Sequence, residues 1–540
     1  MTVKKIHYFW FLLLGFFLYL PSLFFDFSYF DDNVLILDKL FFLKNIGNFF
    51  RIFQQDVFYS SSGSYYRPIL TLSFMLDAQI SGKYPFFYHL SNVLYHIAAA
   101  LLFYLFLKKI KIEEKASFLL ALIFLVHPIL TQAVSWIPGR NDSLLTIFTL
   151  ATFIFLIEYL EKRKIANLIF YFFFFFLALF TKENAIFIPL FSIFFILLFY
   201  QEKKSYLTEL FFGWWMIGFF WFIARQNALK NFFYLSLFEM FSALIFNFPA
   251  LFLYLGKIFF PFNLSVLPTL KDSTLFWGFL ALLVFIILLF WSKKINLKLF
   301  IFGFLWFLFF LFPNFIHPNP KITANFLEHR IYLPLVGFFI VLSSVERLKN
   351  FLADKKNNFF VYFLIIFFAV ITFFHQFNFK DRLTFWQKAV SLSSSSPLAH
   401  RNFGAMLYFD GKIEEAEKEY KKSLEINPGE PMVNNNLGVI YLKQKNFKQA
   451  ISYFEKELKI NPNYDNALFN LGLAYYQLGQ KEKAVSFWKK TIEVNPYYLE
   501  AYKNLANLYL LEKDINQANF YFDLYLKNGG EKLMKRNKWR

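Results

Sequence analysis

Long apolar runs constrain the fold of this chain more than any other feature. Runs of about 20 apolar residues recur along roughly the first 375 positions, and a helix of that length spans the hydrocarbon core of a bilayer. Backbone polar groups find no water inside a bilayer, so such segments are expected to be helical. With 57% hydrophobic residues and 85 Phe, the composition lies well outside that of soluble globular chains. We therefore expect an all-α, polytopic domain embedded in the lipid bilayer.

The apolar runs predict about 11 spans. Their approximate bounds are 6–25, 88–107, 116–135, 143–160, 166–180, 185–200, 208–224, 275–291, 299–313, 330–345 and 358–375. Basic residues gather in short loops after alternate spans, and such loops stay in the cytoplasm. This rule places the amino terminus inside and everything after 375 outside. The apolar stretch 225–274 must then cross an even number of times, giving about 11 or 13 spans; we favour 11, because 231–262 is short for two full crossings.

Charge and cysteine content exclude several function classes. The net charge is +19, but the basic residues sit mostly in the loops between spans, so membrane orientation explains them and no nucleic-acid partner is expected. The chain has no Cys, which excludes disulfides, zinc–thiolate sites and cysteine nucleophiles. Residues 1–25 resemble a signal peptide but lack a small-residue cleavage site, so we expect them to remain as the first span. The expected location is the inner (cytoplasmic) membrane.

The carboxy-terminal part changes character and repeats with a period of 34 residues. The repeated positions are Asn427, Asn461 and Asn495, each followed by Pro; Gly404, Gly438, Gly472 and Ala506; and Ala416, Ala450, Ala484 and Ala518. Small residues allow close helix packing and Pro punctuates each unit, which is the tetratricopeptide pattern. Four repeats are expected at about 397–430, 431–464, 465–498 and 499–530, stacked as an α-solenoid. We thus expect a membrane domain at 1–380, a linker at 381–396, the repeats at 397–530 on the periplasmic or extracellular side, and a basic tail at 531–540.

A column of amides also repeats at this interval. Its members are Asn402, Asn436, Asn470 and Asn504. Amides on one face of a solenoid can hydrogen-bond an extended peptide without reading its sequence. The alternative is that these side chains only support packing between repeats.

Two adjacent carboxylates, Asp31 and Asp32, follow the first span. Neighbouring like charges repel, which tends to raise one pKa, and a general base can use that arrangement. The alternatives are a solvated pair of loop acids, or a site for a divalent cation.

Other uncommon polar groups fall on the same predicted side of the membrane. They are Arg67, His127, Arg140, Asn141, Asp142, Lys182, Glu183, Glu328 and Arg330. Ionisable groups at span ends are costly unless they pair or line a wet cavity, so this clustering is a hypothesis of function. Arg140, Lys182 and Arg330 come from three different loops and would suit an anionic leaving group. The alternative is that each lies at a span end and extends its charge into the interface.

His89, Asn92 and His96 share a face of the second predicted span. A metal pair would prefer a spacing of four residues, and a third ligand is missing from the pattern. Hydrogen bonds between helices are the favoured interpretation.

Several motifs in series resemble a known family. They are FDDN (30–33), YRPILTLSFMLD (66–77), YHLSNVLYH (88–96), VHPILTQAVSWIPGRND (126–142), TKEN (181–184) and EHRIYLPLVGF (328–338). Their order and spacing, followed by tetratricopeptide repeats, resemble the GT-C class of polytopic glycosyltransferases, in particular the transmembrane-and-TPR O-mannosyltransferases and their bacterial relatives.

The resemblance implies a transferase that uses a polyprenyl-phosphate-linked sugar. Asp31 or Asp32 would be the base, and Arg140, Lys182 and Arg330 would hold the lipid phosphate. Supporting roles fall to Arg67, His89, His127, Asp142, Glu183 and Glu328. No cofactor or metal is required, although a divalent cation could bind at Asp31 and Asp32.

One carboxylate suffices for a single displacement. Adjacent residues cannot straddle a sugar, so we expect inversion at the anomeric carbon. The expected acceptor is a protein hydroxyl, with the acceptor protein bound in the repeat groove. Two alternatives stay open: a transferase acting on a lipid or glycan acceptor, and a non-enzymatic membrane scaffold whose repeats dock partners.

Overall fold

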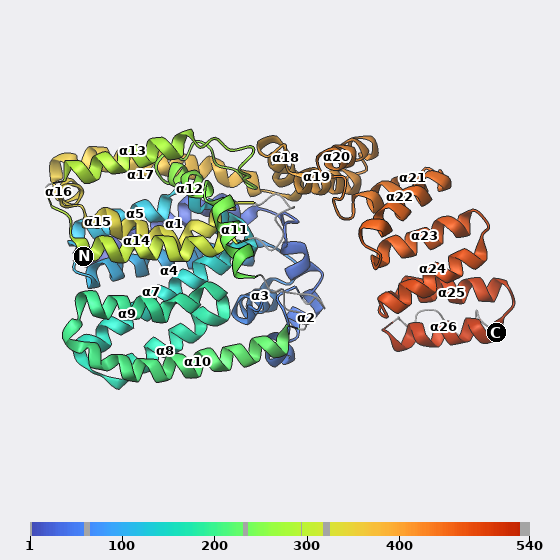
Figure 1. Ribbon diagram of the computed structural model, residues 1–540, viewed down its shortest axis with the longest axis horizontal. Helices are drawn as coiled ribbons and strands as arrows, with labels where there is room; N and C mark the ends of the chain where they lie inside the picture. The colour runs from blue at the N-terminus through green and yellow to red at the C-terminus, as the bar shows by residue number, and fades with distance from the viewer. Residues whose placement is uncertain (1–2, 59–64, 230–235, 293, 317–324, 530–540) are drawn as a thin grey trace. The chain divides into compact units, whose positions relative to one another are not determined.

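The computed structural model describes residues 3–58, 65–229, 236–292, 294–316 and 325–529 (Figure 1). Regular structure in these residues is helical, and the only extended pairing among them consists of two isolated β-bridges. The all-α class expected from the sequence is confirmed. The chain divides into two compact units, residues 1–393 and residues 394–540.

The first unit contains helices α1 to α18. The α-helices are α1 (Val3–Tyr19), α2 (Leu40–Lys44), α3 (Pro68–Ser81), α4 (Phe86–Lys109), α5 (Glu114–Val126), α6 (Thr131–Ser135), α7 (Arg140–Lys162), α8 (Ile165–Thr181), α9 (Ile188–Phe199), α10 (Leu207–Ala228), α11 (Leu237–Asn247), α12 (Ala250–Phe259), α13 (Phe276–Trp291), α14 (Leu297–Leu311), α15 (Tyr332–Ser344), α16 (Glu346–Ala353), α17 (Asn358–His375) and α18 (Arg382–Leu392). Shorter turns, 3-10 except for the π-helical η2, are η1 (Leu20–Phe24), η2 (Asn33–Leu37), η3 (Ile46–Gln54), η4 (Pro128–Leu130), η5 (Ile137–Gly139), η6 (Glu183–Phe187), η7 (Gln201–Tyr206), η8 (Phe312–Phe315), η9 (Glu328–Ile331), η10 (Lys355–Asn357) and η11 (Gln376–Phe379).

Helix length and composition support a multi-pass membrane domain. Within the described residues, six helices are long and apolar enough to span a bilayer, and two pairs bent at a short break pass the same test when joined. Three shorter apolar helices, at 165–181, 183–199 and 276–291, coincide closely with predicted spans. The exposed surface of α10 and α13 consists of large apolar side chains such as Phe219 and Phe290. This surface suits contact with lipid rather than water.

Small residues allow a close helix contact between α14 and α15. A Cβ atom built on Gly303 of α14 would lie 2.6 Å from the carbonyl oxygen of Gly337 on α15, and the reverse substitution meets the same distance. Real Cβ atoms do not approach an oxygen so closely, so both positions need glycine. Close approach through small residues is a common way to pack helices in a membrane, where lipid is as apolar as the side chains.

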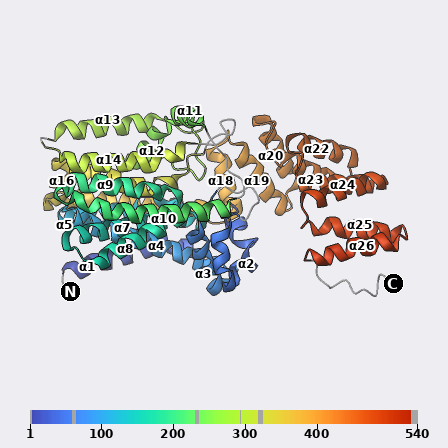
Figure 2. The same ribbon diagram turned by 60° about the horizontal axis from the view of Figure 1, so that its bottom comes forward.

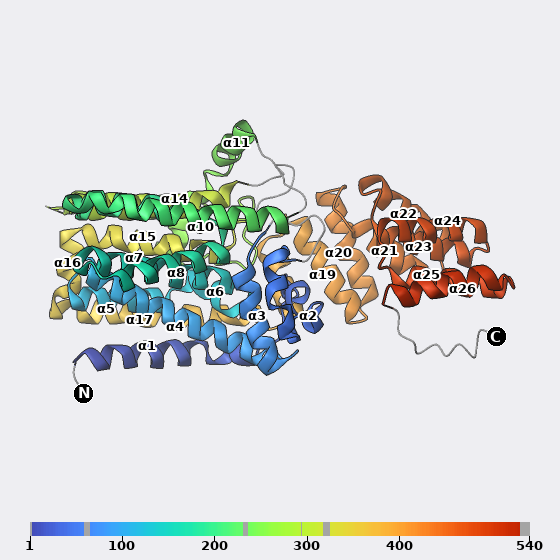
Figure 3. The same ribbon diagram turned by 90° about the horizontal axis from the view of Figure 1, so that it is seen from below.

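Different loops gather at the two ends of the helix bundle. Figures 1, 2 and 3 show the amino terminus and α16 at one end, and α2 and α3 at the other. The first end holds the basic loops, where Lys108 pairs with Glu114 at 2.9 Å and Lys115 donates to the carbonyl of Ala353. The second end holds the acidic pair at 31–32 and the loops expected to carry the site. The described parts of the predicted outer loops thus gather at one end of the bundle.

The stretch between α10 and α13 begins and ends at this second end. The end of α10 contacts η3, and α13 begins where Trp277 packs against Phe260. Between them, α11 and α12 meet at a bend of 44°. Asn247 at the end of α11 donates to the carbonyl of Phe315 at 2.8 Å, which also belongs to the second end. This arrangement agrees with the even number of crossings that the parity argument required.

Helix α18 lies within the segment 381–396 that the sequence placed between the domains. Its side chains Phe385 and Trp386 are fully buried in the first unit. Asp381 caps the helix by accepting a hydrogen bond from the backbone N–H of Thr384 at 2.8 Å. Residues up to 393 therefore pack as part of the membrane unit.

The second unit is a series of four helix pairs. Its helices are α19 (Pro397–Phe409), α20 (Ile413–Ile426), α21 (Val433–Lys443), α22 (Phe447–Ile460), α23 (Asp465–Gln477), α24 (Lys481–Val494), α25 (Leu499–Leu511) and α26 (Ile515–Lys527). In the first three pairs, the repeated glycine faces an aromatic ring: a Cβ on Gly438 would lie 2.5 Å from Phe454, and one on Gly472 would lie 2.5 Å from Trp488. The solenoid predicted from the 34-residue period is confirmed, and the basic tail at 531–540 lies outside the described residues.

Candidate active site

A cavity of about 380 Å³ opens at the second end of the membrane unit. Its polar lining comes from Asp31, Tyr65, Arg67, Trp136, Asn141, Lys182, Glu183, Asn184, Asn314, His329 and Arg330. These residues come from loops far apart in the sequence, and six of them were singled out by the sequence analysis. Within this lining, three basic side chains and two acidic ones face one space.

The loop that carries Asp31 is held by stacked rings and by its own acidic neighbour. Phe30 stacks between Trp136 and Phe385, with ring centroids 4.9 and 5.4 Å apart. The indole N–H of Trp136 also donates to the carbonyl of Phe30 at 2.7 Å. Asp31 adopts a left-handed backbone conformation, φ 68°, which costs about 1–2 kcal/mol for a residue with a Cβ. Such strain persists only where the surroundings fix the chain.

Asp32 is turned away from the cavity and buried. One oxygen of its carboxylate accepts two hydrogen bonds of 2.8 Å, from the backbone N–H and from the hydroxyl of Ser28. Burial raises the pKa of Asp32 to about 7, although the Ser28 hydrogen bonds lower it. This carboxylate closes the loop around Phe30 rather than facing the cavity.

Of the two adjacent aspartates, Asp31 is the one that lines the cavity. Burial raises its pKa to about 6, and the nearby charge of Arg67 partly opposes this rise. A carboxylate with this pKa is mostly ionised at neutral pH and is a stronger base than an ordinary aspartate.

Two ion pairs hold cations in the lining of the cavity. The guanidinium of Arg67 donates to one oxygen of Glu183 at 3.2 and 3.3 Å. The ammonium of Lys182 lies 2.7 Å from Asp142. Burial lowers the pKa of Lys182, and the charge of Arg67 lowers it further, while Asp142 acts in the opposite direction. Arg67 and Lys182 are adjacent cations whose mutual repulsion a bound anion would relieve.

Arg330 enters the cavity from η9. Its guanidinium donates to the carbonyl of Asn325 at 2.7 Å. The preceding His329 stands against Trp136, with ring centroids 5.1 Å apart, and lies 3.8 Å from Asp142. Burial and the charges of nearby cations, Lys182 first, hold the pKa of His329 well below its ordinary value. The imidazole is therefore neutral at physiological pH.

The sequence analysis missed His329 and Trp136 as cavity residues and named Asn141 only among the polar cluster. His329 stands within the EHRIYLPLVGF motif, and the other two stand within VHPILTQAVSWIPGRND. Membership of these motifs was the one signal in the sequence that could have pointed to these three residues. Which side chain of a motif faces a cavity depends on turns such as η5 and η9, which periodicity does not predict.

Arg140 does not line the cavity, although the sequence suggested a phosphate contact. It is fully buried in the first turn of α7. Its guanidinium donates to Asp77 at 2.5 Å, to the carbonyl of Tyr88 at 2.6 Å and to Asn92 at 2.7 Å. These bonds tie α7 to α3 and α4. The charge of Arg140 is thus compensated inside the protein. Arg67, rather than Arg140, lines the cavity together with Lys182 and Arg330.

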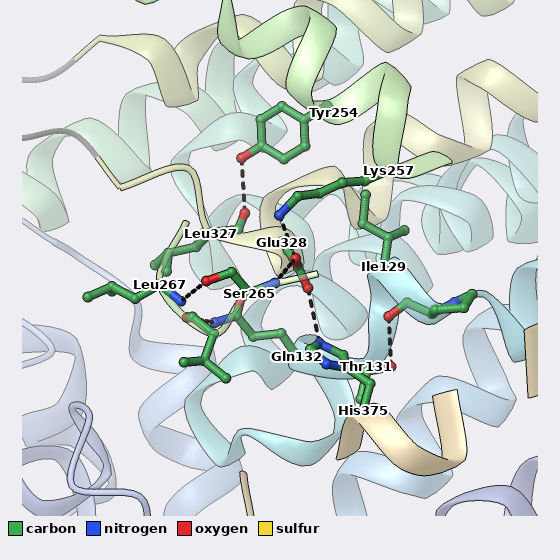
Figure 4. Close-up of polar contacts among 12 residues, drawn as sticks. Ile129, Thr131, Gln132, Tyr254, Lys257, Ser265, Leu267, Leu327, Glu328 and His375 are labelled. Atoms are coloured by element: carbon green, nitrogen blue, oxygen red, sulfur yellow. Dashed lines mark hydrogen bonds and ion pairs between the residues drawn. The ribbon is translucent and has the colours of Figure 1, made fainter. Parts of the chain in front are cut away.

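Four supporting residues also lie outside the cavity lining, and one of them, Asp142, is the partner of Lys182 described above. His89 is buried on α4, edge-on to Phe25. His127 donates from Nε2 to the carbonyl of Ile258 at 3.1 Å. Glu328 points away from the cavity, toward Lys257 and His375 (Figure 4). Each of these has a structural contact rather than a place at the cavity.

Of the two histidines of α4, His96 forms the expected hydrogen bonds between helices. His96 contacts the hydroxyl of Tyr332 at 2.6 Å and the carbonyl of Leu125 at 2.8 Å. In the part of the chain that the structure describes, no group of three or more His, Asp or Glu side chains is arranged to hold a metal ion.

The amide column of the repeats is partly engaged within the solenoid. Asn470 donates to Asn435 at 3.0 Å, and Asn435 donates to Asn436 at 3.4 Å. Arg401 donates to Asn402 at 3.3 Å. Asn504 lines a separate cavity of about 430 Å³ between α23 and α25.

Family models match the second unit. The matched descriptions are both tetratricopeptide repeat, at residues 402–430 and 429–496. Solved structures match the same part: one titled "Crystal structure of MamA" is 21% identical and covers 27% of this chain and 86% of that chain, with a TM-score of 0.25. A TM-score this low does not establish that the two structures share a fold.

Curated relatives carry a consistent name. "Protein O-mannosyl-transferase TMTC2" of Mus musculus is 37% identical over 155 residues, covering 28% of this chain and 18% of the relative. "Protein O-mannosyl-transferase F38B6.6" of Caenorhabditis elegans is 26% identical over 393 residues, covering 68% of this chain and 56% of the relative. "Protein O-mannosyl-transferase TMTC3" of Homo sapiens is 39% identical over 89 residues, covering 16% and 10%.

The matches thus span 10 to 56% of the length of these relatives. The longest of them extends beyond the repeats into the membrane unit, because 393 residues exceed the length of the second unit. The chain therefore resembles the transmembrane-and-TPR protein O-mannosyl-transferases, and its carboxy-terminal unit consists of tetratricopeptide repeats.

Proposed function

We propose that this chain is a membrane glycosyltransferase that moves a mannose-like hexose from a polyprenyl-phosphate donor to a hydroxyl group of a protein. The observation that carries the proposal is the cavity in which Asp31 lies near three cations, Arg67, Lys182 and Arg330. The second carboxylate of the lining, Glu183, is paired with Arg67. Sugar transfer from a phosphate needs a base for the nucleophile and charge stabilisation for the leaving group. The names of the relatives support a mannosyl donor.

In the proposed reaction, the acceptor oxygen attacks the anomeric carbon while its proton passes to Asp31. The bond between the anomeric carbon and the phosphate oxygen breaks, and polyprenyl phosphate leaves with the electron pair. A single displacement of this kind inverts the anomeric centre. We assign the base to Asp31 rather than Asp32 because only Asp31 lines the cavity.

The departing phosphate would be held by Arg67, Lys182 and Arg330. Arg binds phosphate through two parallel hydrogen bonds, while Lys acts as a compact charge. Arg67 and Lys182 are already paired with Glu183 and Asp142, so binding would make use of their remaining N–H groups. Arg140 takes no part in this proposal except as a support for α7.

We further propose that the cavity faces the outer side of the cytoplasmic membrane and that the repeats bind the acceptor protein. The basic loops at the opposite end of the bundle support this orientation. The chain has no native Cys, so single cysteines introduced at Lys203 and at Lys271 can be tested with a membrane-impermeant maleimide on intact cells. Labelling at 271 alone is expected, and labelling at 203 alone would reverse the orientation.

The reaction itself is tested with purified protein in detergent. Polyprenyl-phosphate mannose, glucose, galactose and N-acetylglucosamine are supplied in parallel with a cell extract as acceptor, and released polyprenyl phosphate is measured. Release that depends on one sugar and is lost in Asp31→Asn is the expected result. An EDTA-treated sample tests whether a divalent cation at Asp31 and Asp32 is needed. Folded protein that releases no polyprenyl phosphate from any donor would support the scaffold alternative.

A further inference from the structure

One wall of the cavity is the short turn η9 with the residue before it. His329 and Arg330 face the cavity from this turn. Glu328, their neighbour, is directed the other way and is fully buried. The direction of Arg330 therefore depends on how Leu327 and Glu328 are anchored behind it.

The anchor is α12, and Figure 4 shows the contacts. The ammonium of Lys257 lies 2.6 Å from one carboxylate oxygen of Glu328, and the backbone N–H of Ser265 donates to that oxygen at 2.7 Å. One turn earlier on the same helix, the hydroxyl of Tyr254 donates to the carbonyl of Leu327 at 3.0 Å. Residues three apart share a helix face, so two side chains of α12 hold two consecutive residues behind the cavity wall.

The other oxygen of Glu328 faces α17. His375 Nε2, at the end of α17, lies 3.3 Å from it, and Asn378 contacts the opposite ring nitrogen at 3.0 Å. Burial alone would raise the pKa of Glu328, but Lys257 and His375 outweigh it, so the pKa lies below its ordinary value. Glu328 is thus an ionised group that joins α12 and α17 to η9.

Lys257 is also an unusual residue for its place. It is 2% exposed on a helix that is otherwise apolar. A buried ion pair of this kind adds little stability compared with apolar packing. The contacts of Glu328 instead fix its geometry, because its carboxylate can bond to Lys257, Ser265 and His375 together only in one orientation.

We propose that Lys257 is a positioning residue that, through Glu328, directs Arg330 toward the phosphate of the donor. The proposal rests on the proposed function for the reaction that Arg330 serves. It assigns a role to the α11–α12 segment, which the sequence left without one. A misplacement of about 1 Å in a group that stabilises a transition state can cost about a hundredfold in rate.

The test compares Lys257→Met with Lys271→Met, a control that removes an exposed lysine of the segment between α12 and α13. Polyprenyl-phosphate release is measured with the active donor over a range of concentrations. Lys257→Met is expected to lower kcat at least about tenfold, with the KM for the donor changing less than about threefold. Lys271→Met is expected to match the wild type.

A double-mutant cycle separates positioning from general damage. If Lys257 acts through Arg330, then Lys257→Met should lower kcat by less than about twofold when Arg330 is already Ala. Equal losses in the two backgrounds would overturn the proposal. Lys257→Arg, which keeps the charge, is expected to recover most of kcat; failure to recover any activity in a folded variant would also overturn it.

Two further measurements keep the outcome decisive. If Lys257→Met does not fold, Glu328→Gln takes its place, because it keeps the shape of the side chain and removes the charge that pairs with Lys257: a fall in kcat supports the proposal and an unchanged kcat overturns it. Binding of polyprenyl phosphate alone, followed by the melting temperature in detergent, is independent of turnover. A wild type that is inactive with every donor contradicts the proposed function, whereas an active wild type with an equally active, folded Lys257→Met contradicts the positioning role.

Discussion

Replacing Asp31 by Asn tests the assignment of the base and uses the burial of this carboxylate. The substitution keeps the shape of the side chain and removes its ability to take a proton. Loss of a general base slows a reaction by about 10²–10⁴-fold, so kcat should fall by at least about a hundredfold. In the wild type, kcat/KM should rise with pH through about 6, the pKa that burial gives Asp31, and then level off.

The same substitution should stabilise the protein at high pH. The pKa of Asp31 is raised from 3.8 to about 6 in the folded protein. Ionisation of Asp31 therefore lowers the free energy of unfolding by about 3 kcal/mol. For a carboxyl with a raised pKa, this loss develops as pH rises from about 4 through 6. Asp31→Asn avoids it, so its melting temperature should exceed that of the wild type at pH 8 and match it near pH 4.

The assay pairs donor turnover with thermal unfolding in detergent between about pH 4 and pH 8. Asp32→Asn is the matched control, because it neutralises the neighbouring carboxyl, while its side-chain oxygen can still accept from Ser28 and it lies outside the cavity. A kcat within tenfold of the wild type in Asp31→Asn would refute the assignment. So would a flat pH profile, or a larger loss in Asp32→Asn than in Asp31→Asn.

Three further predictions concern structure and acceptor. Arg140→Met should lower the free energy of unfolding by about 3–5 kcal/mol, because it leaves Asp77 buried without its partner; a variant that melts like the wild type but no longer binds donor would contradict the structural role of Arg140. Lys445→Gly should stabilise the repeats by about 1 kcal/mol in chemical denaturation, since Lys445 has φ 58° where the neighbouring repeats have Gly; an unchanged midpoint would count against strain there. Deleting 394–540 should abolish transfer to protein acceptors, whereas continued transfer to a lipid or glycan would favour that alternative acceptor.

The membrane class and the repeat solenoid followed directly from the sequence. Both depend on short-range periodicity: apolar runs of span length, and small residues such as Gly438 and Gly472 every 34 positions. A helix satisfies its own backbone hydrogen bonds, so its existence can be inferred from its own residues. The gathering of Asp31 and the basic groups of later loops at one end also followed, because alternating spans place alternate loops together.

The tertiary structure alone decided which of these groups face one another. Asp31 and Asp32 are adjacent in sequence, yet only the first lines the cavity, because the left-handed turn at Asp31 and the bonds to Ser28 direct the second inward. Arg140 was indistinguishable from Arg67 by charge and loop position, but its place in the first turn of α7 buries it against Asp77.

The contact between Lys257 and Glu328 joins residues far apart in the chain, and no local pattern encodes it. Periodicity predicts that a helix forms, and the basic loops predict on which side of the membrane each of its ends lies. The direction of a single buried side chain depends on the packing of several helices and loops at once, and that is set by the folded chain as a whole.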